Sequence, residues 1–480
     1  MFAYAVAYRP LMGAAALVAF AAAAALVLRR REVGAVSLRS LLVGLVLVLP
    51  SAALIGPAAG LPAAPQLFAF RLLLVAIAAL GVPALLLSEA RPLAVERWRP
   101  ALPLALWVGW LCLALLWAPD KTAGLTYLAL LGSMLAVVAA TAVAGVTRRR
   151  LLAFGITMIA AYTAIVGITG LEATSGLRLP TSRLAEGAGS QYFAVTSVFH
   201  NQNDLATYLA ICWPFLLGAA FFTRRARWLV LAVLLALPGA FAFVRTGSRS
   251  SLLAAGLSTI VLLVVLAQPG SWLRTRRASI VGALLALALF AGAGYLLFND
   301  STDPMLRQFR LSALLEDITE GSGSGSIRSE LYQRGLTIAG GSLLFGAGPG
   351  QAPALLTAGI GGTNLGNLHN WWLELYAEGG LPGFLLHLTF VLGLLWGLLR
   401  RARAPGSPLV RYLATCAFAA LAGFSIGALG PSRTLIFVPM WILYGLSLTI
   451  LAAPWAAEDT ITDGAADDTV TPGREETAVA

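Results

Sequence analysis

Apolar runs recur along almost the whole of this chain, and each is about as long as a membrane-crossing helix. Of the 480 residues, 59% are hydrophobic and only 11% are charged, whereas roughly a quarter of the residues in soluble domains are charged. This pattern predicts an all-α polytopic integral membrane protein with about 12–13 transmembrane helices. Pro50 and Pro57 interrupt the second run. The runs lie near residues 11–28, 40–60, 68–90, 101–118, 123–146, 151–170, 203–221, 228–244, 251–267, 279–298, 380–399, 411–428 and 434–453.

Arginine clusters fall in every second connection between these runs. Because cytoplasmic loops are enriched in Lys and Arg, we expect these clusters to face the cytoplasm and the N-terminus to lie outside. The net charge of +11 then reflects topology and contact with membrane lipids, and indicates no nucleic-acid partner. The clusters are Arg29–Arg31, Arg91/Arg97/Arg99, Arg148–Arg150, Arg224/Arg225/Arg227, Arg274/Arg276/Arg277 and Arg400/Arg401/Arg403. The connections expected to face outward are 171–202, 245–250, 299–370 and 429–433.

The predicted organisation has four parts. Residues 1–298 hold the first ten transmembrane helices with short loops, and residues 371–455 hold the C-terminal ones. Residues 299–370 form an outward-facing loop subdomain between them. Residues 456–480 are acidic and rich in small residues, which predicts a disordered cytoplasmic tail.

The 299–370 loop contains several expected elements. Residues 304–316 have the apolar spacing of an amphipathic helix, and residues 328–338 indicate a second helix. The GSGSGS segment at 321–326 predicts a flexible joint. Residues 340–350 are too rich in glycine for either regular element.

Several common site motifs are missing from the sequence. There is no H-E-x-x-H, no P-loop and no D-x-D in an outward loop, so metal and nucleotide chemistry have no positive support. A Ser–His–Asp triad stays open, although no G-x-S-x-G supports it. The three cysteines, Cys112, Cys212 and Cys416, lie in apolar runs, which predicts packing and no disulfide. We expect neither a cofactor nor a metal.

Polar residues gather in the connections that are expected to face outward. This agreement between two independent patterns predicts an outward-facing site, although outward loops must contain polar residues in any case. The residues concerned are His200, Asn201, Asn203, Asp204, Arg245, Arg249, Arg328 and His369.

The segment R-T-G-S-R-S-S connects two apolar runs and brings Arg245 and Arg249 close together. Guanidinium groups match phosphate oxygens in geometry and charge, so the segment predicts an anion site. The alternatives are arginines that extend toward lipid headgroups, or a simple tight turn.

The segment F-H-N-Q-N-D at 199–204 precedes another apolar run. Asn203 or Asp204 could cap the helix that follows. His200 could instead be a second base or a hydrogen-bond donor to a substrate.

The segment N-L-H-N-W-W-L-E-L-Y-A-E-G-G at 367–380 holds His369, a candidate general base for a hydroxyl proton. The structural alternative is a capping or interfacial histidine. Glu374 and Glu378 share one helix face and could orient His369 or anchor arginines. Aromatic residues at 371, 372 and 376 suggest an interfacial belt, and His387 a hydrogen-bonding residue inside the bundle.

Four segments resemble, in order, those of the O-antigen ligase/polymerase superfamily of membrane glycosyltransferases. The likeness covers roughly residues 190–400, and the long loop followed by further spans also fits. The segments are F-H-N-Q-N-D-L-A (199–206), T-G-S-R-S-S (246–251), R-S-E-L-Y…L-L-F-G-A-G-P-G (328–350) and H-N-W-W-L-E-L-Y-A-E-G-G-L-P-G (369–383).

The resemblance implies a GT-C-like fold and a donor glycan linked to undecaprenyl pyrophosphate. His369 matches the family's essential loop histidine, Arg245 or Arg249 its span-end arginine, and Arg328 its loop arginine. Many members carry a further arginine just before the first segment. This chain has Ala194–Ser197 there, and Arg183 is the nearest substitute. The full set of expected substrate-binding residues is Arg245, Arg249, Arg328, His200, Asn201, Asn203, Asn370 and Arg183.

The leading hypothesis is a ligase of the bacterial inner membrane that transfers a glycan at the periplasmic or outer face. The acceptor would be another glycan or the lipid A core. An O-antigen or exopolysaccharide polymerase, a protein O-oligosaccharyltransferase and a lipid-linked glycan transporter are the alternatives. A transporter would need polar residues along the middle of its spans, where this chain offers few, such as Arg71, Tyr127 and His387.

Overall fold

The computed structural model describes several continuous ranges of the chain. The described residues are 38–61, 64–87, 99–144, 147–185, 194–222, 226–267, 324–341, 344–358, 367–405, 407–431 and 433–452, with separate positions between 292 and 312. The predicted runs at 11–28 and 279–298 and the predicted tail at 456–480 therefore lie wholly or largely outside the described residues.

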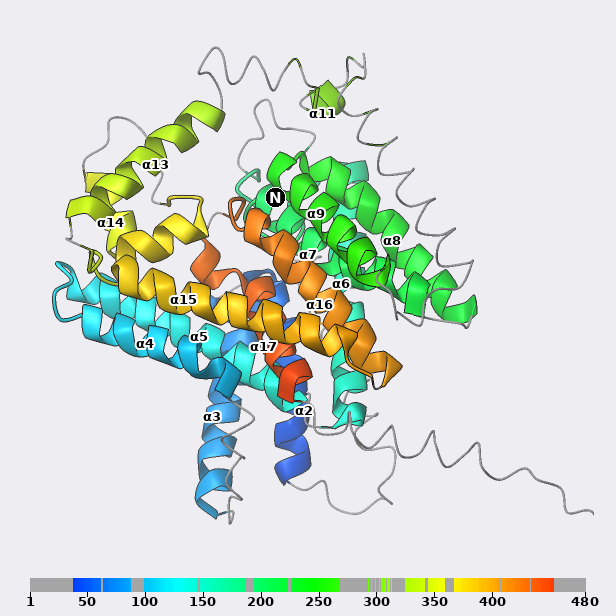
Figure 1. The fold of residues 1–480 in the computed structure, drawn as a ribbon, viewed down its shortest axis with the longest axis horizontal. Coiled ribbons are helices and arrows are strands. Elements are labelled where there is room, and N and C mark those ends of the chain that lie inside the picture. Colours follow the sequence, from blue (N-terminus) through cyan, green and yellow to red (C-terminus); the bar gives the residue numbers. More distant parts are fainter. Residues whose placement is uncertain are drawn as a thin grey trace, which may run out of the picture.

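The described part of the chain is all-α apart from one short hairpin, which agrees with the predicted fold class except for the hairpin (Figure 1). Strands β1 (Gly60–Leu61) and β2 (Ala64–Phe68) pair antiparallel after a short turn, η1 (Gly56–Ala59). The N-terminal helices are α2 (Leu38–Ile55), α3 (Ala69–Leu87), α4 (Leu102–Ala114), α5 (Lys121–Ala144) and α6 (Arg148–Ser175). The middle helices are α7 (Gln202–Phe222), α8 (Ala226–Thr246), α9 (Arg249–Ala267), α11 (Pro304–Arg307), α13 (Ser324–Gly341) and α14 (Gln351–Ala358). The C-terminal elements are α15 (Trp371–Arg403), α16 (Pro408–Gly427), η4 (Thr434–Ile436) and α17 (Val438–Ala452).

Within the described residues, seven helices are long and apolar enough to cross a membrane, and four shorter apolar helices accompany them. Each predicted run outside 11–28 and 279–298 corresponds to one of these helices. Pro50 lies inside α2 and does not end it, contrary to the interruption expected there. Packed neighbours can satisfy the backbone carbonyl that a proline leaves free in a membrane bundle.

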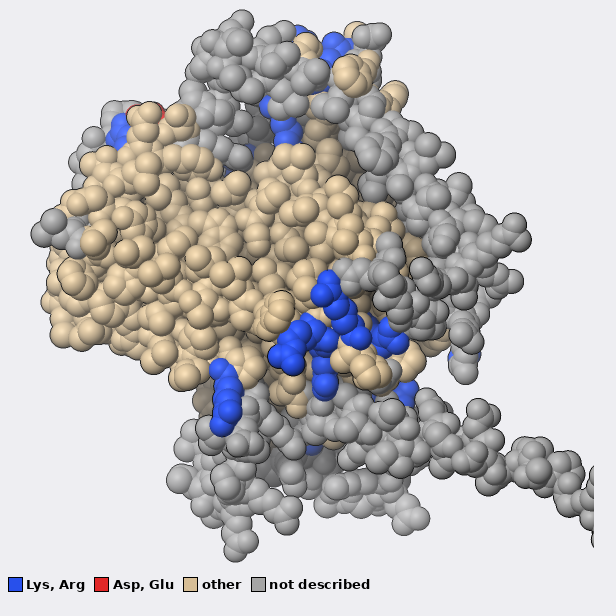
Figure 2. Space-filling view, in the orientation of Figure 1, with Lys and Arg blue, Asp and Glu red and all other residues tan. Residues whose placement is uncertain are grey.

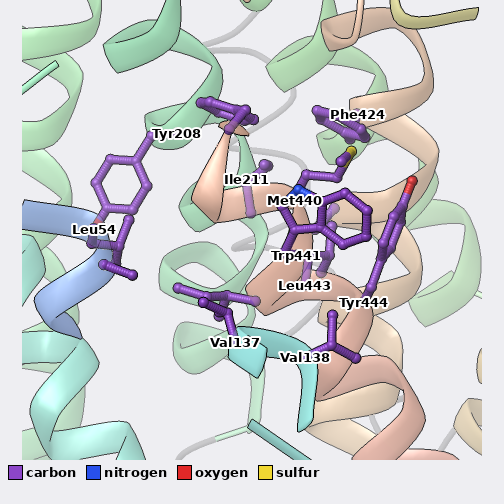
Figure 3. Close-up of a cluster of buried hydrophobic side chains, with 14 of the residues drawn as sticks. Leu54, Val137, Val138, Tyr208, Ile211, Phe424, Met440, Trp441, Leu443 and Tyr444 are labelled. Atoms are coloured by element: carbon purple, nitrogen blue, oxygen red, sulfur yellow. The ribbon is translucent and has the colours of Figure 1, made fainter. Parts of the chain in front are cut away.

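The core lies between α17 and the helices around it. Figure 3 shows Trp441 and Tyr444 of α17 among side chains from α2, α5, α7 and α16. Both aromatic side chains are fully buried. In membrane-spanning helices the outer faces stay apolar, so exposed leucines and valines on α8 and α9 agree with contact to lipid.

Basic side chains gather at one end of the bundle, over the end of α15 and the start of α16 (Figure 2). This patch includes Arg400, Arg401 and Arg403 from the last turn of α15. A broad surface without charge separates the patch from α13 and α14 (Figures 1 and 2). Charge at the ends and an uncharged belt between them are typical of a multi-pass membrane protein.

The loop subdomain agrees with its predictions only in part. The helix expected at 328–338 is confirmed as α13, which starts earlier, at Ser324. Three residues of the expected 321–326 joint thus belong to its first turn, so that prediction is partly wrong. Of the helix expected at 304–316, Pro304–Arg307 and Ser312 are helical and residues 309 and 310 lie in a turn, while the other positions lie outside the described residues. The irregular conformation expected at 340–350 is confirmed for residues 344–350, but it is wrong for Gly340 and Gly341, which end α13.

Candidate functional site

His369 lies just before α15 in a backbone conformation that residues other than glycine rarely adopt. Its φ is 51°, in the left-handed region. The next residue, Asn370, caps the helix because its Oδ1 accepts a hydrogen bond from the N–H of Leu373 at 3.2 Å. His369 therefore lies just before a fixed helix end, and its strained backbone is a feature common at functional sites.

Two hydrogen bonds tie this helix start to the end of α16. The N–H of Trp371 donates to the carbonyl of Ala428 at 3.1 Å, and Nε1 of Trp372 donates to the carbonyl of Ser425 at 2.9 Å. The position of His369 is thus set by a neighbouring helix as well as by its own.

Trp371 is fully buried, so its predicted place in an interfacial belt is wrong. Its Nε1 donates to Nε2 of His387 at 3.3 Å, and the Tyr444 hydroxyl lies 3.2 Å from the same atom. His387 is itself fully buried and packs edge-on against Trp107. The prediction that His387 is a hydrogen-bonding residue of the bundle is confirmed.

The α8–α9 connection forms the compact turn that the sequence indicates. Arg245 ends α8, Gly247 has a φ of 70°, and Arg249 begins α9. Both arginines are partly exposed, and Nε of Arg245 is a buried atom without a hydrogen-bond partner. A short turn with two partly exposed guanidinium groups can accept an anion.

The hydroxyl of Ser251 links the start of α9 to α7. Its Oγ lies 3.1 Å from Oγ1 of Thr207 in α7 and accepts from Oγ of Ser248 at 3.1 Å. Thr207 in turn donates to the carbonyl of Asn203 at 2.8 Å. The first turns of α7 and α9 therefore form one hydrogen-bonded unit.

The segment 428–430 touches this unit and the start of α15 together. A Cβ atom on Gly430 would lie 3.1 Å from Oγ1 of Thr207 and 3.3 Å from Oγ of Ser250. Two residues earlier, the carbonyl of Ala428 accepts a hydrogen bond from the N–H of Trp371. One short backbone segment thus brings the region of His369 beside the starts of α7 and α9.

The start of α7 differs from its prediction. The residue before the helix is Asn201, whose Oδ1 accepts from the N–H of Asn203 at 2.9 Å. The expectation that Asn203 or Asp204 caps this helix is therefore wrong. The cap lies two residues before Asn203 and three before Asp204, because α7 already begins at Gln202.

Arg183 and His200 lie together on this helix start. Arg183 donates from Nη2 and Nε to Oε1 of Gln202 at 2.9 and 3.1 Å, and its N–H donates to the carbonyl of His200. The Nδ1 atom of His200 lies 2.9 Å from the carbonyl of Thr181. Desolvation lowers the pKa of Arg183 from its ordinary value, and the carboxylate of Asp204 opposes that shift.

Sequence reasoning missed the buried carboxylate of Glu172, which is 5% exposed. It accepts hydrogen bonds from the N–H groups of Thr196 and Ser197 at 2.9 and 2.7 Å, where Ser197 has a φ of 52°. Nearby, Arg178 donates to the carbonyl of Ala194 at 3.0 Å. A lone carboxylate at the end of an apolar run is the signal that could have pointed to Glu172.

The glycine-rich turn at 344–350 docks on a break in α15. Gly380 has a φ of 63° inside α15, and the N–H groups of Ala347 and Gly348 donate to the carbonyls of Ala377 and Glu378. Across the same contact, the N–H of Leu381 donates to the carbonyl of Leu344 at 2.7 Å. The third and fourth family-like segments are therefore one structural unit.

Side chains of α4 and its connection to α5 hold this turn from the other side. Nε1 of Trp117 donates to the carbonyl of Gly346 at 3.0 Å. Gln351 and Asp120 exchange two hydrogen bonds, of 3.0 and 2.8 Å, between the amide of the glutamine and the backbone of the aspartate. These contacts fix the turn between α4 and α15.

Glu374 and Glu378 are both buried, at 7% and 1% exposed. The carboxylate of Glu378 faces the hydroxyl of Tyr127 and the backbone N–H groups at the start of α14, although its oxygens form no hydrogen bond of good geometry. Both roles expected of these carboxylates, orienting His369 and anchoring an arginine, stay predictions.

Arg328 lies in α13, the helix above this region. Seven residues on, and so on the same face of the helix, a Cβ on Gly335 would lie 2.9 Å from a methyl of Leu368 and 2.7 Å from a methyl of Leu373. Helix α13 therefore packs directly on the residues that flank His369.

No group of three or more His, Cys, Asp or Glu side chains within the described ranges is arranged to hold a metal ion.

Comparison with known proteins gives two matches. A family model described as O-antigen ligase matches residues 230–388, which include the α8–α9 turn, the glycine-rich turn and His369. The chain is also 26% identical over 396 residues to the teichuronic acid biosynthesis protein TuaE of Bacillus subtilis (strain 168). That match covers 79% of this chain and 78% of the relative.

Proposed function

The chain belongs to the O-antigen ligase/polymerase superfamily of membrane glycosyltransferases, and we propose that it transfers a glycan from undecaprenyl pyrophosphate to an acceptor hydroxyl. The transfer takes place at the outer face of the bacterial inner membrane. The observation that carries this proposal is the segment 428–430, which contacts the start of α15 on one side and the starts of α7 and α9 on the other.

In the proposed reaction, His369 is the general base. It removes the proton of the acceptor hydroxyl while the oxygen attacks the anomeric carbon of the donor sugar. The bond from that carbon to the pyrophosphate oxygen breaks, and undecaprenyl pyrophosphate leaves with the bonding electrons. Attack from the face opposite the leaving group gives inversion at the anomeric carbon.

The leaving pyrophosphate requires positive charge, which Arg245 and Arg249 supply from the α8–α9 turn. Arg328 adds a third guanidinium from α13. His200, Asn201, Asn203, Asn370 and Arg183 complete the polar surface that faces the glycan.

Ligase-type transfer to a glycan or to the lipid A core is the first form of this proposal. A polymerase that joins repeat units is the second, and the name of one relative agrees with a role in making a polysaccharide under either form. The relative from Bacillus subtilis is named for teichuronic acid biosynthesis. Both forms use the same donor and the same base, and they differ only in the acceptor.

The test uses purified protein with a lipid-pyrophosphate-linked glycan and a matching acceptor. We expect His369→Ala to lower the rate of transfer by at least a hundredfold, in the range of a lost general base. The control is Thr389→Ala, an exposed position on the same helix, which should transfer at the wild-type rate.

A second measurement separates catalysis from folding. His369→Ala should elute as the wild-type protein does in size-exclusion chromatography and should still bind undecaprenyl pyrophosphate. If His369→Ala transfers the glycan at the wild-type rate, His369 is not the general base. If the wild-type protein does not bind undecaprenyl pyrophosphate, the proposed donor is wrong.

A further inference from the structure

Arginine side chains lie together where α15 ends and α16 begins (Figure 2). Arg400, Arg401 and Arg403 occupy the last turn of α15. Arg411 lies near the start of α16, where its N–H donates to the carbonyl of Ser407 at 3.1 Å. Arg400 and Arg403 are exposed, and the other two are half-buried. These four residues are called the arginine patch below.

Helix α17 ends beside the arginine patch. A Cβ on Gly397 would lie 2.8 Å from a methyl of Leu451, so the last turn of α17 packs on α15. Arg400 and Arg401 follow Gly397 by one helical turn, which advances the chain about 5.4 Å. The chain therefore leaves α17, at Ala452, close to the patch.

The acidic residues of the described ranges lie away from this end of the bundle. Glu374 lies in the first turn of α15, whereas Arg403 lies in its last turn. In the same way, Glu172 lies near the end of α6, which begins at Arg148. The other acidic residues in these ranges are Asp120, Asp204, Glu330 and Glu378, near the α4–α5 connection, the start of α7, α13 and the start of α15. Carboxylates and the arginine patch are thus separated along the bundle, which leaves a positive potential at the patch.

The sequence that follows α17 is the most acidic part of the chain. Residues 458–476 contain seven of its 22 acidic residues and one arginine, Arg474. The acidic residues are Glu458, Asp459, Asp463, Asp467, Asp468, Glu475 and Glu476. This segment lies outside the described residues. Its charge is opposite in sign to that of the arginine patch.

The acidic segment can reach the arginine patch. An extended chain spans at most about 3.5 Å per residue, so Glu458 can lie up to about 20 Å from Ala452. Because both partners belong to one chain, the effective concentration of one at the other is of millimolar order. Charge pairs at a surface are individually weak, but several of them can hold a partner that is already tethered.

We propose that the acidic segment, residues 456–480, docks on the arginine patch of its own chain and covers it against anionic phospholipid headgroups. Arginines next to a membrane attract such headgroups, and carboxylates and lipid phosphates compete for the same guanidinium donors. The tether gives the carboxylates the advantage. The docking does not depend on the identity of the glycan donor or of the base.

The first test measures the distribution of distances between two spin labels by pulsed electron resonance. The labels are attached to Ala404→Cys beside the patch and Ala466→Cys in the acidic segment, with the three native cysteines replaced by alanine. The protein is placed in nanodiscs of equal parts phosphatidylcholine and phosphatidylglycerol. We expect a distribution at least twofold narrower than in a neutral variant, whose seven acidic residues are changed to Asn or Gln. Salt at about 1 M should broaden it, because the Debye length then falls to about 3 Å.

The second test changes the patch and counts bound lipid. Arg400→Gln combined with Arg403→Gln should broaden the distribution as the neutral variant does. The control is Arg334→Gln, an arginine of α13 that pairs with Glu330, which should leave the distribution narrow. By native mass spectrometry, the neutral variant should retain about twice as much phosphatidylglycerol as the wild type. It keeps every described residue, so a folding defect of the bundle is not expected.

Three outcomes would overturn the proposal. If the wild-type distribution is as broad as that of the neutral variant, the acidic segment does not dock. If it is narrow in phosphatidylcholine alone and broad once phosphatidylglycerol is present, anionic headgroups occupy the patch. If it is narrow in every variant and at high salt, contacts other than charge hold the segment and the arginine patch is not its site.

Discussion

Gly346 and Gly380 meet where the glycine-rich turn docks on the break in α15, and neither position has room for a Cβ atom. A Cβ on Gly346 would overlap the backbone of Glu378 and Gly380, and one on Gly380 would overlap the backbone of residues 344–346. Both glycines have positive φ. The two segments are therefore joined backbone to backbone.

Gly380→Ala should destabilise the protein by about 3 kcal/mol. A non-glycine residue in the left-handed region costs about 1–2 kcal/mol, and overpacking adds about 1–3 kcal/mol. The free energy of unfolding in mixed micelles measures this. Gly393→Ala, in the same helix with open space around it, is the control and should be neutral or slightly stabilising. Equal stability of the two variants would contradict the docking of the turn.

His387→Ala should destabilise the protein by about 2–4 kcal/mol, whereas His369→Ala should change stability by less than about 1 kcal/mol. The first substitution leaves a cavity and removes the partner of Trp371 and Tyr444. Unfolding of the two variants under identical conditions checks this. The opposite order of stabilities would show that His369 is the structural histidine.

Glu172→Gln should loosen the segment before α7. Both N–H groups, of Thr196 and Ser197, donate to Oε2 of the carboxylate, and glutamine offers them only a neutral amide oxygen. Its NH2 would also take the place of Oε1, which accepts from the hydroxyl of Thr196. Hydrogen exchange of the peptide covering residues 194–201 should become faster. Ser175→Ala, at the exposed end of the same helix, is the control. Unchanged exchange in Glu172→Gln would mean that its carboxylate does not hold this segment.

Cysteine labelling tests the orientation that the arginine pattern predicts. In a background where the three native cysteines are replaced by alanine, Thr337→Cys on α13 and Arg403→Cys at the end of α15 introduce exposed thiols. A membrane-impermeant maleimide should label the first variant in intact spheroplasts and the second only after permeabilisation. The reverse pattern would place α13 and the candidate site in the cytoplasm.

The sequence predicts most of the described helices because a backbone that crosses a membrane must satisfy its own hydrogen bonds. An apolar run of that length does so as a helix. It also predicts the turn at Arg245 and Arg249, since glycine between two short polar residues marks a tight connection. The helix start at His369 and the role of His387 follow from similar local signals. Local patterns were thus sufficient where the neighbours of a residue in sequence decide its structure.

Other features depend on contacts between distant segments. Trp371 is of a residue type common at the membrane interface, yet it is buried because it packs against Trp107 and His387. Glu172 carries no motif, and only its hydrogen bonds to Thr196 and Ser197 draw attention to it. The cap at Asn201 differs from the expected one because α7 already begins at Gln202. Tertiary packing decides all three.

The hydrogen bond from Trp371 to Ala428 has a consequence for how the proposed reaction is aligned. This bond joins the helix that follows His369 to the segment 428–430, which approaches Thr207 and Ser250. The transmembrane bundle itself would then hold the proposed base at a fixed distance from the α8–α9 turn. In such an enzyme the line of attack is built in before any substrate arrives, and the long, flexible lipid-linked glycan is the component that has to adjust.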